Sequence, residues 1–399
     1  MKITFITPKI NFVSAGGSVF DIDLKMKAFM KMGADIRCVT PFSDDNDMPQ
    51  KPPYPVIEEL IARRGLAGIA WGVYKILKKY EKGTDFFHID GHIYFYGAGL
   101  YKRLGGKVPI IAFFNREQPI WGHDNPKYSF GMFDEPADAR WWRKLWLKLR
   151  YQIESKIGTW LANAIEIGTF HTPTLQKRYN DFGLHIQYQL INPDLAGIDT
   201  KGASRSVASF THTPLRLAAA GRLIPTKGFD LLFKAFSLVP RRQRFTLTLA
   251  GEGPDEPRLR NLAKEWGIEK EVSFTGWLTH DKLFPFFESS DVFLMPRWRP
   301  ELSSVVLMEA MSHGLVAVVP KGGGLEWAGG KAIVGFDFDD PESLARAIDS
   351  LGNPEFLAEK SAAIGKRIEF LHYENWLPVT YLFMKKVLAE KNKTKRAGR

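Results

Sequence analysis

Two glutamates stand eight positions apart in the segment RPELSSVVLMEAMSHG, between Pro300 and Gly314. The run VVLMEAMSHG predicts a helix that Gly314 ends, with Glu301 in the loop before it and Glu309 about two turns inside it. The apolar neighbours of Glu309 predict that its carboxylate is buried, and a buried carboxylate requires a partner. We expect both carboxylates to accept hydrogen bonds from hydroxyl groups, such as those of a sugar or ribose, at different depths of one cleft.

A second group of candidate residues follows the apolar segment LRLAAAG. Arg222 and Lys227 come directly after Gly221 and before the next predicted helix. Ligands of parallel α/β sheets bind beyond the carboxyl ends of the strands, where both cations are expected. The fork of an arginine and the point charge of a lysine together suit a diphosphate, and a pair of solvated loop charges is the alternative.

A pair of glycines near the start of the chain gives a third candidate. Gly16, Gly17 and Ser18 lie between a predicted strand and a predicted helix that Ser18 or Asp21 would open. Glycine lets a backbone approach a ligand closely, and the free N–H groups of a helix start point at anions. An ordinary turn before a helix is the alternative.

Short apolar runs alternate with segments that can form helices, which predicts an α/β fold with parallel sheets covered on both faces. They are KITFIT, DIRCVT, TDFFHID, VPIIAFF and AIEIGTF, and the pattern restarts with LRLAAAG, RFTLTLAG, VSFTG, DVFLMP and GLVAVVP. A chain of 399 residues suits two such domains. We expect Rossmann-like domains at 1–195 and 215–370 with a linker at 196–214. A helix at 371–390 is expected to pack back on the first domain, followed by a basic tail at 391–399.

Composition limits the class of protein. The single cysteine, Cys38, excludes an internal disulfide, and no apolar run approaches about 18 residues. We therefore expect a cytoplasmic protein without a signal peptide or membrane-spanning helix. The net charge is +11, but more than half of this excess lies from Lys385 onward and no nucleic-acid-binding motif accompanies it. The tail is either a solvated end or a segment attracted to anionic lipid.

The segment DARWWRKLWLKLRYQIESK predicts an amphipathic helix. Its apolar residues follow helical spacing, and arginines and lysines occupy other positions; the apolar residues are Trp142, Leu145, Trp146, Leu149 and Ile153. Tryptophan with basic residues on one such helix is typical of proteins that lie on a membrane surface. A helix packed on its own domain is the alternative.

Several motifs together resemble a known family. GRLIPTKG, LAGEGP, VSFTGWL, SSDVFLMP, the spacing of Glu301 and Glu309, and HGLVAVVP occur in the order found in the family 4 retaining glycosyltransferases, also called glycosyl transferases group 1. The resemblance is strong over the second domain and weaker over the first, through GGS, DFFHID and INPDLAGID. It implies the GT-B fold, in which two Rossmann-like domains face a central cleft. It also implies retaining transfer of a hexose from a nucleotide diphosphate sugar to a glycan or lipid-linked acceptor.

The resemblance further implies roles for individual residues. Arg222 and Lys227 would hold the donor diphosphate, Glu309 the ribose hydroxyl groups, and Glu301 the transferred sugar. The nucleobase would lie near Trp277, and the remaining implied donor contacts are Gly16, Gly17, Gly221, Leu302, Ser303, Ser304 and Val305. Because two cations already neutralise the leaving diphosphate, this family usually works without a metal ion, and no cofactor is expected.

Two departures from the family pattern keep alternatives open. Ser303 and Ser304 stand where a small glycine and an aromatic residue usually follow the first glutamate. Asn115 stands where many members have a histidine at a strand end, and it cannot shuttle a proton; His88 or His92 is the alternative contact to sugar or acceptor. A sugar-nucleotide epimerase of the same fold, or a sugar-nucleotide binding protein without activity, would also fit these motifs.

Overall fold

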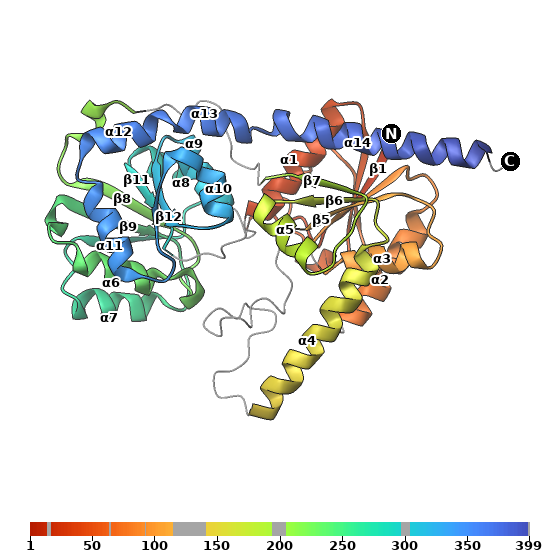
Figure 1. Ribbon diagram of the computed structural model, residues 1–399, viewed down its shortest axis with the longest axis horizontal. Coiled ribbons are helices and arrows are strands. Elements are labelled where there is room, and N and C mark those ends of the chain that lie inside the picture. Colours follow the sequence, from red (N-terminus) through yellow and green to blue (C-terminus); the bar gives the residue numbers. More distant parts are fainter. Residues whose placement is uncertain are drawn as a thin grey trace. The chain divides into compact units, whose positions relative to one another are not determined.

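The computed structural model describes residues 1–13, 17–63, 65–91, 93–114, 141–193, 205–296 and 304–397. The chain divides into two units, of which unit 1 comprises Met1–Pro193 and Glu374–Arg399, and unit 2 comprises Asp194–Tyr373 (Figure 1). Each unit contains one parallel β-sheet flanked by helices. The predicted α/β class and its two Rossmann-like units are therefore confirmed.

The sheet of unit 1 has the strand order β3-β2-β1-β4-β5-β6-β7. Its strands are β1 (Lys2–Ile6), β2 (Asp35–Thr40), β3 (Val56–Glu58), β4 (Phe86–Asp90), β5 (Ile110–Phe114), β6 (Ile167–Phe170) and β7 (Tyr188–Ile191). In β1, Ile3 lies opposite Ile36 of β2 on one side and Phe86 of β4 on the other. The direction of winding reverses between β1 and β4, so the carboxyl ends of these two strands form a topological switch point.

The helices described in unit 1 are α1 (Gly17–Lys31), α2 (Gly65–Tyr80), α3 (Phe95–Arg103), α4 (Trp141–Ala162), α5 (Pro173–Asp181) and α14 (Tyr373–Ala397), with a short 3-10 helix at Ser43–Asp45. The helix α1 already begins at Gly17, so neither Ser18 nor Asp21 opens it as expected. Asp21 lies in its second turn, where its carboxylate pairs with Lys25. The first turn of α1, with its N–H groups, therefore starts at Gly17, the second glycine of the pair.

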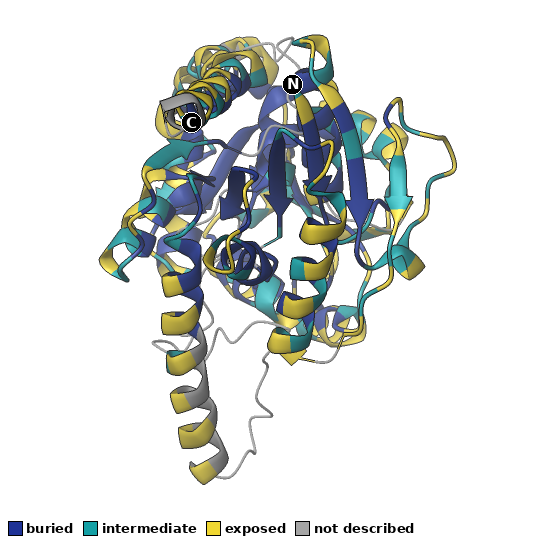
Figure 2. Ribbon diagram, turned by 90° about the vertical axis from the view of Figure 1, so that its right-hand side faces the viewer, coloured by how far each residue is buried: buried dark blue, intermediate teal, exposed yellow. Residues whose placement is uncertain are grey.

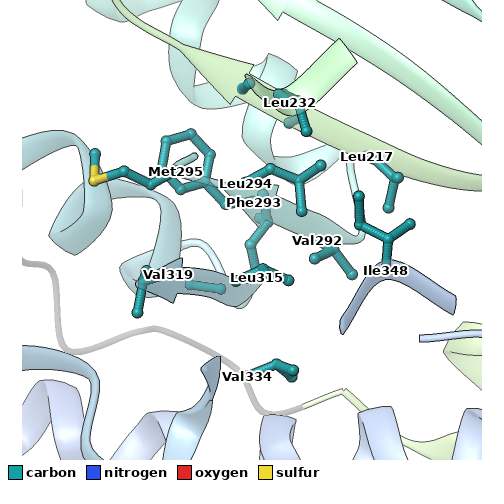
Figure 3. Close-up of a cluster of buried hydrophobic side chains, with 14 of the residues drawn as sticks. Leu217, Leu232, Val292, Phe293, Leu294, Met295, Leu315, Val319, Val334 and Ile348 are labelled. Carbon is teal, nitrogen blue, oxygen red and sulfur yellow. The ribbon is translucent and has the colours of Figure 1, made fainter. Parts of the chain in front are cut away.

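The sheet of unit 2 has the strand order β10-β9-β8-β11-β12-β13. Its strands are β8 (Leu215–Ala220), β9 (Phe245–Ala250), β10 (Val272–Gly276), β11 (Val292–Leu294), β12 (Val316–Pro320) and β13 (Ile333–Phe336). Figure 3 shows the apolar side chains of β11 packed against Leu217 of β8 and Ile348 of a neighbouring helix. Winding reverses between β8 and β11, which places the switch point of this unit at their carboxyl ends.

Helices cover the sheet of unit 2. They are α6 (Phe229–Leu238), α7 (Glu256–Glu265), α8 (His280–Glu288), α9 (Val305–Ser312), α10 (Gly324–Gly329), α11 (Pro341–Ser350), α12 (Pro354–Ala362) and α13 (Ile364–Leu371). Short 3-10 helices lie at Val207–Phe210, Pro225–Lys227, Arg242–Arg244 and Gly330–Ala332.

The segment expected as a linker, 196–214, is in part a piece of unit 2. Phe210 is only 3% exposed in the core of that unit. The backbone N–H of Arg205 donates to Ser361 Oγ at 2.6 Å, and its guanidinium lies 3.3 Å from the carboxylate of Asp291. Phe210 and Arg205 stand alone in a Ser- and Thr-rich run, so no periodic pattern in the sequence predicts their contacts. Residues 196–204 lie outside the described part of the chain.

The helix α14 runs without interruption through Pro378 and through most of the expected basic tail. One face is buried in unit 1, through Leu377, Tyr381, Met384 and Val387. The ring of Tyr381 stacks on that of Phe29, with centroids 5.6 Å apart. The start of the tail is therefore a folded helix that packs on unit 1. Among the described helices, none combines the length and the apolar character needed to cross a membrane.

Candidate active site

The carboxyl ends of β8 and β11 lead to the cation pair and to the helix that carries Glu309, at one edge of one sheet. The two strands pair directly and in parallel, with Val292 opposite Leu217. Arg222 follows β8 by two residues, and α9, which carries Glu309, is the next described helix after β11. Open α/β sheets bind ligands at such a switch point because the connections on its two sides lead away in opposite directions.

Close backbone contact fixes the end of β8. The N–H of Gly221 donates to the carbonyl of Ala250 at 2.9 Å, and the N–H of Gly251 donates to that of Gly276 at 2.8 Å. A Cβ on Gly251, which has a φ of +143°, would lie only 1.9 Å from the carbonyl oxygen of Gly221. Only glycine fits this position. The backbone of Gly221, which is predicted to lie beside the ligand, is therefore held by its contacts with Ala250 at the end of β9 and with Gly251.

The two cations that follow β8 differ in their exposure to solvent. Arg222 is exposed, whereas Lys227 is partly buried at the end of its 3-10 helix. Burial, with the positive charge of Arg222 as a second cause, lowers the pKa of the Lys227 amine to about 7. Two like charges in such a setting are stabilised by an anion between them. This electrostatic arrangement suits a diphosphate.

Glu309 is 4% exposed, so the predicted burial of its carboxylate is confirmed. It is the fifth residue of α9, little more than one turn inside the helix rather than the two turns expected. Its Oε1 lies 3.0 Å from Nε2 of His280, the first residue of α8, and this contact raises the pKa of the His280 imidazole. The predicted partner therefore exists, but sequence reasoning did not identify it as His280. The only signal was a polar residue at a helix start soon after the FTGWL loop.

The other predicted donor contacts are divided between the two units. Ser304 is 6% exposed and directly precedes α9, and Val305 is the first residue of that helix. Trp277 follows β10, is 46% exposed, and donates its backbone N–H to Glu252 Oε1 at 3.1 Å. Gly17 is the first residue of α1 in unit 1. Five predicted residues lie outside the described part of the chain: Gly16, Asn115, Glu301, Leu302 and Ser303, as does His92.

A buried polar cluster at the carboxyl edge of the unit 1 sheet was not predicted. Nζ of Lys25 lies 2.5 Å from Oδ2 of Asp21 and 3.4 Å from the centroid of the Phe113 ring. The hydroxyl of Thr7 donates to Oδ2 of Asp90 at 3.1 Å. Burial raises the pKa of the Asp90 carboxyl to about 6, although the ammonium of Lys25 opposes this rise. Thr7 directly follows β1, and Asp90 is the last residue of β4. Their place at strand ends was the one feature of the sequence that could have predicted this cluster.

His88 is a core residue, which overturns its expected contact with sugar or acceptor. It lies in the middle of β4, is 1% exposed, and stacks on Phe5 with ring centroids 4.3 Å apart. Burial lowers the pKa of its imidazole to about 3. A histidine at the true end of a strand is His171, directly after β6, which stacks on Phe113 at 4.6 Å.

Within the described ranges, no group of three or more His, Cys, Asp and Glu side chains is placed to hold a metal ion. Independence from metal ions remains a prediction for this chain.

Comparison with known proteins finds a family model that is similar to most of unit 2. Residues 201–369 match the family model described as glycosyl transferases group 1. The lipopolysaccharide core biosynthesis glycosyltransferase LpsE of Rhizobium meliloti (strain 1021) is 28% identical over 193 residues, which are 45% of this chain and 52% of LpsE. A GDP-mannose-dependent monoacylated alpha-(1-6)-phosphatidylinositol monomannoside mannosyltransferase of Corynebacterium glutamicum is 28% identical over 235 residues, which are 54% of this chain and 59% of the relative. The chain thus spans little more than half the length of these curated relatives.

The fold is similar over nearly the whole chain to that of a solved structure. Sucrose-phosphate synthase from Thermosynechococcus elongatus has a TM-score of 0.74 at 17% identity, covering 98% of this chain and 99% of that one. At this identity the likeness concerns the fold alone. Residues 201–369 of unit 2 are thus similar to glycosyl transferases group 1, and the chain as a whole has the GT-B fold that the sequence predicted.

Proposed function

We propose that this chain is a retaining glycosyltransferase that moves a hexose from a nucleotide diphosphate sugar to a glycan or lipid-linked acceptor. The observation that carries the proposal is the convergence of a cation pair and a buried carboxylate at one switch point. Arg222 and Lys227 follow β8, and Glu309 lies on α9, which follows the neighbouring strand β11. The partner of Glu309, His280, opens α8, which follows β10. Phosphate charge and ribose hydroxyl groups are the two features that such residues recognise together.

The cation pair serves the leaving group. Negative charge grows on the departing diphosphate as the bond to the sugar breaks, and fixed positive charge stabilises that state most. Lys227, with its pKa near 7, takes up a proton when the diphosphate binds beside it. Arg222 supplies several N–H donors in a planar fork. This pair supports the proposal that no metal ion is needed.

Glu309 serves the nucleoside. A carboxylate has more acceptor sites than the single hydrogen bond to His280 uses, so it can accept ribose hydroxyl groups as well. Glu301 is proposed as the partner of the transferred sugar, on the family resemblance of its segment. Retention at the anomeric carbon rests on the same resemblance.

The names of the relatives support a membrane-linked glycan as acceptor. One relative acts in lipopolysaccharide core biosynthesis, and another glycosylates a phosphatidylinositol mannoside, so both names describe glycans on lipids. We propose an equivalent acceptor here, with the enzyme in the cytoplasm or peripheral on the inner face of the membrane. The second relative is named as GDP-mannose-dependent, which supports a nucleotide diphosphate sugar as donor.

Donor binding is the first test. Isothermal titration with UDP-glucose, GDP-mannose and related nucleotide sugars should identify one that binds the intact chain. Lys227→Met and Glu309→Gln should each weaken that binding by about tenfold to a hundredfold, because each removes a charge-assisted hydrogen bond. Lys264→Met, at an exposed lysine on α7, is the matched control and should bind as the wild type does. Unchanged affinity in both site variants would reject the proposed donor site.

Product analysis separates the alternatives. Incubation of the intact protein with the donor and a lipopolysaccharide core or glycolipid extract should give a glycosylated product, and nuclear magnetic resonance of the new linkage reports its anomeric configuration. Release of an epimerised free nucleotide sugar without acceptor would instead identify an epimerase. Tight donor binding without transfer or hydrolysis, over a broad acceptor panel, would identify a binding protein.

A further inference from the structure

The helix α4 carries a long exposed apolar stripe. Seven of its side chains are each between 50% and 61% exposed: Trp142, Leu145, Trp146, Leu149, Ile153, Ile157 and Trp160. Their spacings of three and four residues place all seven on one face of the helix. The sequence pattern ended at Ile153, and the structure extends the stripe to Trp160. At 1.5 Å per residue the stripe is about 27 Å long.

The opposite face of α4 is already used within unit 1. A Cβ on Gly158 would lie 2.5 Å from the ring of Tyr96 on α3, and a Cβ on Gly99 of α3 would lie 2.4 Å from the carbonyl oxygen of Leu161. Helix α4 therefore packs on α3 through its C-terminal half, and exposed residues recur along the helix (Figure 2). Helix α4 thus packs on its own domain through this half, while the seven apolar side chains of the stripe are each at least half exposed.

Positive charge accompanies the stripe. Helix α4 contains five basic residues and a single acidic one, Glu154. At its C-terminal end the guanidinium of Arg103 lies 4.4 Å from the ring centroid of Trp160 and donates to the Trp160 carbonyl at 2.8 Å. Contiguous apolar surface of this extent marks an interaction site. Because a second copy would bring two basic helices together, charge complementarity favours an anionic partner.

We propose that α4 is a membrane-docking helix whose stripe inserts into the interface of an anionic lipid bilayer. Tryptophan rings favour the headgroup level, and lysines and arginines beside them attract anionic lipid. The helix would lie along the membrane plane and hold unit 1 at the surface. The inference deepens the proposed function, since a lipid-linked acceptor lies at the same surface. Lipid binding itself requires neither donor nor catalysis.

Vesicle sedimentation of the intact chain tests this surface. The probes are vesicles of phosphatidylcholine alone and of phosphatidylcholine with phosphatidylglycerol. We expect binding to the anionic vesicles, and a loss of at least about tenfold in partition coefficient for the double variant Trp142→Ser with Trp146→Ser, because apolar insertion is lost. Trp71→Ser is the matched control: it changes a tryptophan of α2 that is 48% exposed, and it should bind as the wild type does.

Three outcomes would overturn the proposal. The first is that the intact chain fails to sediment with anionic vesicles even at low salt. The second is a concentration-dependent dimer that the double variant abolishes, without lipid binding, which would identify a second copy as the partner. The third is a lowered melting temperature of the double variant without lipid binding, which would indicate that another segment of the chain covers the stripe. Donor titration of the same variants in solution should be unchanged, so failure of the docking surface and failure of the donor site remain distinguishable.

Discussion

The amine of Lys227 is set to titrate near neutral pH, which makes donor binding a proton-linked reaction. Its pKa is about 7 in the free protein, and an adjacent diphosphate favours the protonated form. The two phosphate groups of a nucleotide diphosphate sugar are ionised throughout this range, so the proton is taken up by the protein. Below about pH 7 the amine is already protonated, and binding takes up no proton.

We therefore predict that donor affinity falls as pH rises above about 7, by up to about tenfold per pH unit. Titration calorimetry in buffers of different ionisation enthalpy should detect uptake of nearly one proton at about pH 8 and almost none at about pH 6. Lys227→Met should bind more weakly and lose this dependence. A wild-type affinity that is independent of pH would contradict the assignment of Lys227 to the diphosphate.

The same cation pair predicts resistance to chelators. Arg222 and Lys227 supply the positive charge that a divalent metal ion would otherwise bring to the departing diphosphate. Transfer activity should therefore be unchanged after dialysis against EDTA. Loss of activity that magnesium or manganese restores would show that the pair is insufficient and would require a metal site.

Asp90 in unit 1 predicts an unusual dependence of stability on pH. Burial raises its pKa to about 6, above the value of 3.8 for an ordinary aspartate, so the folded state binds more protons between these two pH values. Stability of unit 1 therefore decreases as pH rises through this window, and the full cost of the ionised carboxylate is present above about pH 6.

Asp90→Asn should remove that cost while it keeps the acceptor for Thr7. We expect the variant to match the wild type near pH 4 and to be more stable by about 2 to 3 kcal/mol at pH 7 and above. Urea unfolding followed over this pH range measures the difference. Asp35→Asn, at an exposed residue of β2, controls for the loss of one negative charge. A variant less stable than the wild type at pH 7 would mean that the Asp90 carboxylate stabilises the fold.

At the scale of elements, Glu166 connects three parts of unit 1. Its Oε1 lies 2.8 Å from Nζ of Lys102 on α3 and 2.8 Å from Nζ of Lys391 on α14, and its Oε2 accepts the N–H of Ile110 at 2.9 Å. Burial lowers the pKa of the Lys102 amine, while Glu166 opposes this. One carboxylate therefore compensates two ammonium groups, one of them poorly solvated.

Glu166→Gln should keep the bond to Ile110 and leave both ammonium groups without their counter-charge. We expect unit 1 to lose about 1.5 to 3 kcal/mol of stability, and the C-terminal turns of α14 to exchange their amide hydrogens faster. Hydrogen exchange with mass spectrometry measures both. Glu269→Gln, at an exposed residue of unit 2, is the matched control. Unchanged exchange in α14 would indicate that its apolar face alone fixes it.

The strands that the sequence predicted are central ones, except for the edge strand β10. Central strands such as β4, β5, β8 and β12 read as continuous apolar runs, because helices cover both sides of a parallel sheet. The missed strands β3, β7 and β13 all lie at sheet edges and have only three or four residues each, so their apolar signal is short.

The residues of the candidate site also divide into those that the sequence predicted and those that it missed. Arg222, Lys227 and Glu309 were predictable because strand ends and an apolar helix point to them along the chain. The partner of Glu309, His280, was not, since it meets this carboxylate from another helix through packing that local sequence does not encode.

At the scale of the whole molecule, the chain returns to unit 1 after it has completed unit 2. The apolar spacing of α14 was visible in the sequence, but its packing surface includes residues far earlier in the chain, such as Phe29 near the start. Such a contact joins the two ends of the chain in one folding unit. Stability of unit 1 should therefore depend on residues that follow unit 2 in the sequence.

Two leucines of α14 test this dependence under matched conditions. Leu377 is 0% exposed and Leu382 is 62% exposed, on the same helix and five residues apart. Leu377→Ala should lower the stability of unit 1 by about 2 to 5 kcal/mol, because it removes buried methyl groups and leaves a cavity. Leu382→Ala should change it by less than about 0.5 kcal/mol. Hydrogen exchange should locate the loss in the sheet of unit 1 and leave that of unit 2 unchanged, because α14 belongs to unit 1. Equal effects of the two substitutions, or a loss that appears in unit 2, would mean that α14 does not complete the core of unit 1.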